Sequence, residues 1–128
     1  MANNIDGPEI TLKAYGDLSA YQFHIMKVGT DGKANLATDP DDHTACMIGI
    51  LQNKPDAADE PAVVRIEGVA KVVGGATIAA GTKVTCDGDG HLAAAVSGDN
   101  VIGIALETAG STKITQILLC HGSTISDA

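Results

Sequence analysis

Short segments in which apolar and polar residues alternate are separated along this chain by turns rich in glycine and aspartate. Tyr21, Phe23 and Ile25 alternate with polar neighbours. A period of two residues is typical of a strand with one buried face. Similar segments lie at 64–67, 69–73, 83–86 and 113–119, and the turns between segments include 31–32, 74–75, 87–90, 97–100 and 109–110. Helical periodicity is never sustained for a dozen residues, so the sequence predicts an all-β fold.

The chain also repeats itself weakly. Ile48-Gly49-Ile50 is echoed 54 positions later by Ile102-Gly103-Ile104, and the same offset carries Val63-Val64 onto Ile117-Leu118. Duplicated β units can close on one another and bury both apolar faces. We therefore expect a compact β-barrel or β-sandwich built from two weakly similar halves, with the pseudo-repeat at about 21–68 and 83–122. Chance similarity between strands rich in glycine and valine is the alternative.

Residues 1–18 precede the repeat, and their apolar side chains are too widely spaced for an independent fold. We interpret them as an extended N-terminal arm that packs on the domain or orders on a partner, followed by a single β domain at 19–128. The alternative is an ordinary first strand, from Glu9 to Ala14, at the sheet edge. The candidate partner contacts of the arm are Ile5, Pro8, Ile10, Leu12, Tyr15 and Leu18.

Aromatic residues are scarce, with two tyrosines, one phenylalanine and no tryptophan. Large rings supply much of the buried area in most cores, so a core of aliphatic side chains and alanine buries less area per residue. We expect a single copy to be modestly stable and to gain from self-association or from docking on a partner.

Acidic residues outnumber basic ones by 16 to 8, which gives a formal net charge of −8. Phosphate backbones and anionic lipids attract clusters of lysine and arginine, so this balance argues against nucleic-acid and membrane partners. The N-terminus lacks a basic region followed by an apolar stretch, so we expect no secretory signal. Three cysteines (Cys46, Cys86 and Cys120) without framework spacing predict free thiols in a reducing compartment.

Several motifs suggest chemistry but lack a required part. Gly88-x-Gly90-x-x-Ala93 resembles a dinucleotide fingerprint, yet no crossover helix fits before Ser97-Gly98, so a hairpin turn is favoured. Asp87-x-Asp89-Gly90 begins like a calcium loop, but leucine and glycine stand where an EF-hand needs glycine and glutamate. The histidines and cysteines lack the short spacing of zinc ligands.

No nucleophile motif or oxyanion loop marks a catalytic serine or cysteine. Met26-Lys27 resembles the modified lysine of small carrier domains, but it precedes the turn instead of occupying its tip. We assign no catalytic residue, no cofactor and no metal, and we expect a protein that is not an enzyme. A carrier domain and a small hydrolase stay as weaker alternatives.

The stretch from Ile48 to Leu119 resembles the capsid decoration, or cement, proteins of tailed bacteriophages. The resemblance covers more than half of the chain and depends on the order and spacing of several modest motifs. These are Ile48-Gly49-Ile50-Leu51-Gln52, Val69-Ala70-Lys71-Val72, Gly75-Ala76-x-Ile78-x-Ala80-Gly81-x-Lys83-Val84-Thr85, Asp87-x-Asp89-Gly90, Ile102-Gly103-Ile104-Ala105-Leu106-Glu107 and Ile117-Leu118-Leu119.

The resemblance implies a structural virion protein, made in the host cytoplasm, that binds the outer surface of the expanded capsid and stabilises it. It implies the major capsid protein as partner and a homo-oligomer, most simply a trimer. In this interpretation the arm residues named above contact the capsid, by adding to a sheet edge. A head fibre, or another small β-rich virion module, is the alternative.

Overall fold

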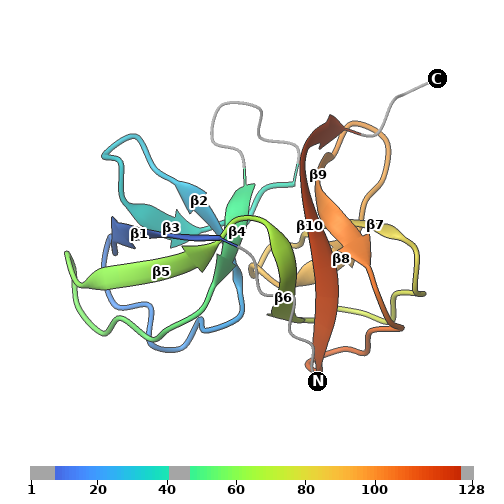
Figure 1. Ribbon diagram of the computed structural model, residues 1–128, viewed down its shortest axis with the longest axis horizontal. Coiled ribbons are helices and arrows are strands. Elements are labelled where there is room, and N and C mark those ends of the chain that lie inside the picture. Colours follow the sequence, from blue (N-terminus) through green and yellow to red (C-terminus); the bar gives the residue numbers. More distant parts are fainter. Residues whose placement is uncertain (1–7, 41–46, 125–128) are drawn as a thin grey trace.

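The computed structural model describes residues 8–40 and 47–124, which form ten strands and no helix. Five strands form each of two antiparallel sheets, which lie side by side in Figure 1. The first sheet contains β1 (Glu9–Lys13), β2 (Ile25–Val28), β3 (Ala34–Leu36), β4 (Met47–Leu51) and β5 (Pro61–Arg65). The second contains β6 (Gly68–Val73), β7 (Lys83–Cys86), β8 (Leu92–Ala94), β9 (Asn100–Ala105) and β10 (Ile114–Thr124).

The two sheets have the same topology. Their strand orders are β1-β5-β4-β2-β3 and β6-β10-β9-β7-β8, so each strand of the first sheet has a counterpart five places later. Each sheet also curls until its edge strands meet at one parallel bridge, between Ala14 and Ala34 in the first and between Gly74 and Leu92 in the second. The prediction of two similar halves in an all-β fold is confirmed. The two sheets stay separate and do not join into one closed barrel, so of the two predicted forms the β-sandwich describes the fold.

Backbone details repeat along with the strand order. The Asp-Gly turns predicted at 31–32 and 89–90 lie in the β2–β3 and β7–β8 hairpins, where Gly32 and Gly90 both have φ 78°. A left-handed glycine is what such a tight turn requires. Asp59 and Thr112 also share a positive φ, at 69° and 61°, in the loops that precede β5 and β10.

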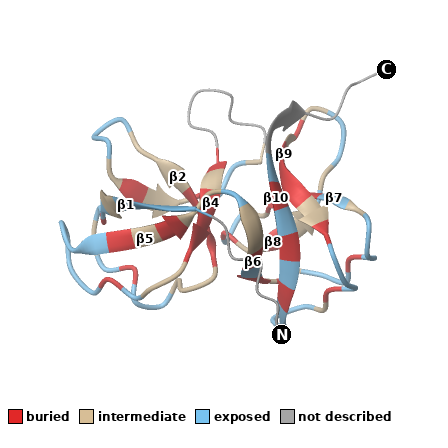
Figure 2. Cartoon of the chain, in the orientation of Figure 1, coloured by how far each residue is buried: buried red, intermediate tan, exposed pale blue. Residues whose placement is uncertain are grey.

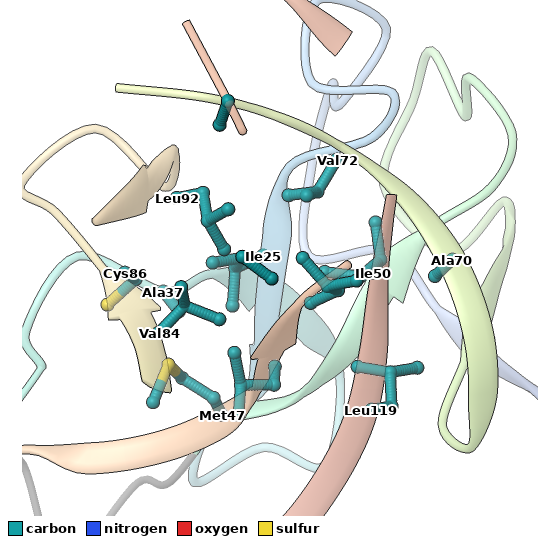
Figure 3. Packing of buried hydrophobic residues seen from close by; sticks show 14 of the residues in the cluster. Ile25, Ala37, Met47, Ile50, Ala70, Val72, Val84, Cys86, Leu92 and Leu119 are labelled. Atoms are coloured by element: carbon teal, nitrogen blue, oxygen red, sulfur yellow. The ribbon is translucent and has the colours of Figure 1, made fainter. Parts of the chain in front are cut away.

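Two hydrophobic clusters fill the molecule. The smaller cluster lies inside the first sheet and includes Leu18, Met26 and Val64, each fully buried. The larger cluster combines the interior of the second sheet with side chains from the other face of the first (Figure 3). Ile25 and Ile50 enter it from the first sheet, so both faces of the first sheet are covered near β2 and β4. This arrangement joins the halves into one unit.

The N-terminal region follows the strand alternative where it is described. Residues 9–13 form β1, which pairs antiparallel with β5 from Glu9↔Arg65 to Lys13↔Pro61. Ala14 and Leu18 are fully buried. The part of the expected arm from Glu9 onward therefore belongs to the first sheet and its core. The remainder of that prediction concerns residues 1–7, which lie outside the described residues.

Candidate capsid-binding surface

The structure separates the six predicted contact residues into three groups. Leu18 is fully buried in the first cluster, and Leu12 packs against that cluster, so both support the fold. Pro8, Ile10 and Tyr15 are exposed, Ile10 by 36% and Tyr15 by 48%. Ile5 lies outside the described residues. Pro8 precedes β1, Ile10 lies within it and Tyr15 follows it, and β1 is an edge strand of its sheet.

The outer edge of β1 can be assigned from its hydrogen bonds. The Pro8 carbonyl accepts from the Ile66 N–H (3.1 Å), and the Ala14 N–H donates to the Glu60 carbonyl (2.9 Å). Backbone groups alternate between the two sides of a strand. Even-numbered residues therefore point their backbone groups toward β5, and those of Glu9, Thr11 and Lys13 point to the other side. Beyond Lys13 that side meets β3, at the Ala14–Ala34 bridge and the hydrogen bond from the Tyr15 N–H to the Ala34 carbonyl (3.1 Å). Among the described residues, the part of this edge without a second strand partner is therefore at Glu9 and Thr11. An edge of this kind is a template for pairing with another strand.

An apolar depression of about 270 Å³ lies beside β1 on the first half. It is lined by Ile10, Ile48, Ile66 and Glu67. The three isoleucine side chains come from β1, from β4 and from the residue that follows β5, and none of them is fully buried. Grouped, partly exposed apolar side chains on a small protein commonly mark a contact surface. Ile10 was predicted from the sequence, but the other two were missed, because their grouping depends on the strand order.

A second apolar surface lies on the outer face of β6, β9 and β10. Leu118 is 40% exposed and pairs with Val69 on one side and Ile104 on the other. Figure 2 shows exposed and buried bands alternating along β10. The sequence contains a sign of this surface, because residues 114–119 carry apolar side chains on both faces of the strand and not on one face only. The sequence pattern alone predicted only an ordinary strand here.

Two ion pairs join separate segments of the first half. Arg65 donates to the Glu9 carboxylate at 2.7 Å and to the Val69 carbonyl at 3.2 Å, and its side chain is only 15% exposed. It therefore links β1 to β5 and the end of the first half to the start of the second. Lys33 and Asp59 form a more exposed pair at 2.8 Å. That contact raises the pKa of Lys33 and lowers the pKa of Asp59.

Three potential metal ligands lie together in the β7–β8 turn. Ligand atoms of Asp87, Asp89 and His91 are within 4.8 Å of one another. The Asp87 carboxylate already accepts the backbone N–H groups of Asp89 (2.8 Å) and His91 (3.0 Å). This is the ordinary role of an aspartate in a turn, so the group supports no metal assignment.

His91 also meets the first half. Its ring centroid lies 4.7 Å from that of His24, which is 8% exposed. The pKa of His24 is lowered, mainly because burial penalises the imidazolium form, and the nearby His91 acts in the same direction. His24 Nδ1 lies 3.1 Å from the Gln22 carbonyl. The pair is therefore a packing contact between the halves.

Two of the three cysteines are in the described part of the chain, and neither forms a disulfide there. Cys86 is buried in the larger cluster, and burial raises the pKa of its thiol to about 12. A thiol with so high a pKa is a poor nucleophile. Cys120 is exposed. Cys46 lies outside the described residues.

The family model described as phage cement protein matches residues 6–120, nearly the whole chain. The chain belongs to the phage cement protein family. It is a structural virion protein that binds the capsid, and the resemblance drawn from the sequence motifs is confirmed. No curated protein sequence matches the chain. A cement protein acts by contact, so its surfaces are its functional sites.

Among solved structures, this cement protein resembles the head fiber gp8.5 N base of bacteriophage phi29. The TM-score is 0.66 with 18% sequence identity, and the match covers 88% of this chain and 93% of that chain. At this identity the likeness shows a shared fold. Within the described residues there is no helix that is long and apolar enough to cross a membrane.

Proposed function

We propose that this cement protein binds the outer surface of the expanded capsid and stabilises it, with the major capsid protein as its partner. The family match across residues 6–120 carries the proposal. The net charge of −8 supports an external position, because an acidic protein is repelled by the negatively charged nucleic acid packaged inside the shell. We propose synthesis in the host cytoplasm, where the thiols stay reduced, and no catalytic role.

Stabilisation follows from selective binding. A ligand shifts an equilibrium between two states only by its difference in affinity for them. A protein that contacts the expanded lattice and not the unexpanded one therefore makes the expanded state more favourable. A tenfold preference at one site contributes about 1.4 kcal/mol, and the many sites of a shell add these contributions.

The edge of β1 is the proposed capsid contact. Strand addition supplies affinity through backbone hydrogen bonds, so it needs little apolar surface. The outward backbone groups of Glu9 and Thr11 are suited to it, because they precede the part of the edge that meets β3. The exposed Pro8 and Tyr15 flank the strand, and Ile5 precedes it in the chain. In this proposal Leu12 and Leu18 hold β1 in place from within.

Co-sedimentation with purified shells tests the function. The wild-type protein should pellet with expanded shells and stay in the supernatant with unexpanded ones. Equal binding to both shells, or binding to neither, would contradict the proposal. Thr11→Pro tests the edge, because proline removes one outward N–H group while the bonds to β5 remain. Thr11→Val is the matched control and should bind as wild type does.

We further propose that the protein acts as a homo-oligomer, with a trimer as the expected state. The scarcity of aromatic residues supports association, since a small aliphatic core gains stability from a partner. A head-fibre component is the second candidate, favoured by the fold shared with the phi29 head fiber base. Copy number per virion separates the two, because a decoration protein should be present in hundreds of copies.

A further inference from the structure

We propose that the depression formed by Ile10, Ile48 and Ile66 is the docking site for a second copy of this chain. The second copy would present the outer face of its β9, centred on Ile104. The inference rests on the homo-oligomer proposed above and deepens it, by naming the two surfaces that meet. The internal duplication supports this inference. The second half has a surface equivalent to the depression, and within each molecule that surface is covered by the first half.

The counterparts of the depression follow from the strand ladders. Ile10 pairs with Val64 in the first sheet, as Ala70 pairs with Ile117 in the second. The Leu51↔Val64 pair of the first sheet corresponds to the Ala105↔Ile117 pair of the second, so Val64 is equivalent to Ile117. Their partners Ile10 and Ala70 are therefore equivalent as well. Counting along the same strands makes Ile48 equivalent to Ile102, and Ile66 equivalent to Leu119.

In the second half this surface is covered. Ala70, Ile102 and Leu119 are 1%, 1% and 6% exposed. They share the larger cluster with Ile25, Met47 and Ile50 of the first half, and β4 contacts both β6 and β9. Figure 3 shows Ile50 and Met47 together with Ala70 and Leu119. The outer face of β4 is therefore what fills the surface.

In the first half the equivalent surface is open in the described structure. Ile10 is 36% exposed, against 1% for Ala70, and Ile48 and Ile66 are only partly buried. The depression of about 270 Å³ lies at the position that corresponds to the surface covered by β4 in the other half. By this comparison, the surface suits the outer face of a strand like β4.

The strand equivalent to β4 is β9, and its outer face is available. Ile50 pairs with Ile25, and correspondingly Ile104 pairs with Lys83. Ile50 is fully buried, whereas Ile104 is partly exposed and Lys83 is exposed. The face thus carries an apolar centre beside a cation, and the depression carries three isoleucines beside the anion Glu67. The two surfaces match in apolar character and in charge.

A contact between two different surfaces of the same chain is head-to-tail, and it forms a ring where the rotation closes. Each copy would then bury its own depression and its own β9 face, so neither of these two surfaces stays exposed. Strand addition to the capsid uses the backbone edge of β1, whereas this contact uses the Ile10 side chain. Both can therefore operate in one particle.

Two variants, each with one damaged surface, test the proposal by light scattering after size exclusion. Ile10→Glu places a charge in the depression, and Ile104→Glu places one on the β9 face. Each should weaken self-association at least about tenfold, because a buried unpaired carboxylate is costly. Ile114→Glu is the matched control and should keep the wild-type mass. Pro61 is the equivalent of Ile114 in the first half, and it is exposed, so it takes no part in the contact between the halves. By the same equivalence, we expect Ile114 to lie outside the contact between copies.

Mixing the two variants is the decisive step. Ile10→Glu keeps a working β9 face and Ile104→Glu keeps a working depression, so the mixture should form a one-to-one dimer and stop there. Dimer formation also shows that both variants are folded. A monomeric wild type, variants of unchanged mass, or a mixture that stays monomeric would overturn the inference. Shell binding, measured on the same samples, decides the capsid proposal separately.

Discussion

Gly49 and Gly103 occupy equivalent positions in β4 and β9, and each lies against a backbone carbonyl of the neighbouring strand. A Cβ at Gly49 would overlap the carbonyl oxygen of Arg65, and one at Gly103 would overlap that of Leu118. Both glycines sit in the Ile-Gly-Ile motif that marks the repeat in the sequence. The motif is thus a packing requirement, which each half meets in the same way.

Alanine at either glycine should therefore destabilise the fold. The clash is with backbone on both sides, so relief requires the strands to separate, and we expect a loss of about 3 kcal/mol or more for Gly49→Ala or Gly103→Ala. Thermal unfolding monitored by circular dichroism measures it. Gly88→Ala is the control, since nothing lies within 4 Å of a Cβ there. Equal melting temperatures for all three variants would refute the explanation.

The fold class was predictable because alternation and turn chemistry are local properties. The register of the last strand was not. An offset of 54 places Val64 on Leu118, whereas the ladders place it on Ile117, because the loop before β10 is one residue shorter than the loop before β5. A shift of one residue exchanges the two faces of a strand. Val64 and Ile117 are both fully buried, and Leu118 is 40% exposed.

The candidate surfaces were predictable only in part. The sequence predicts a strand at Glu9–Ala14 only as the alternative to an extended arm. Its six contact candidates include Ile10, but also Leu18, which is fully buried. A sequence shows that a side chain is apolar, and it does not show whether its own fold or a partner covers it. The depression joins Ile10 to Ile48 and Ile66, which are distant in the chain. Its significance follows from comparing the halves, and that comparison needs the ladders.

The second prediction concerns Arg65. Its guanidinium bonds Glu9 and the Val69 carbonyl while largely shielded from water, so Arg65→Met should cost about 1.5–3 kcal/mol. The exposed Lys33–Asp59 pair provides the contrast, because solvent screens it and Lys33→Met should cost clearly less than Arg65→Met. Urea unfolding curves measure both. An Arg65 variant no less stable than the Lys33 variant would count against a structural role for the shielded pair.

The third prediction concerns thiol reactivity. Cys86 is 1% exposed and its pKa is raised to about 12, whereas Cys120 is exposed. In a Cys46→Ser background, a disulfide reagent at pH 8 should therefore modify one thiol quickly and the second only after denaturation. Cys120→Ser in the same background should remove the fast phase. Rapid modification of both thiols in the native protein would show that the larger cluster opens readily.

The fourth prediction concerns the pH dependence of stability at the contact between His24 and His91. Burial lowers the pKa of His24 in the folded protein below its ordinary value of 6.5, and the His91 ring at 4.7 Å adds to that effect. The Asp87 carboxylate and the Gln22 carbonyl oppose it. Between the two pKa values the unfolded chain binds more protons, so stability falls as pH drops below 6.5. Above that value the full contribution of neutral His24 is present.

His24→Gln tests this effect, because the glutamine amide can still donate to the Gln22 carbonyl but does not titrate. Wild type should lose more stability than His24→Gln when the pH is lowered from 7.5 to 5, measured as the shift in melting temperature. His91→Gln should reduce the loss partially, since it removes the repulsion but leaves the burial of His24. Parallel pH profiles for wild type and His24→Gln would show that His24 does not control this dependence.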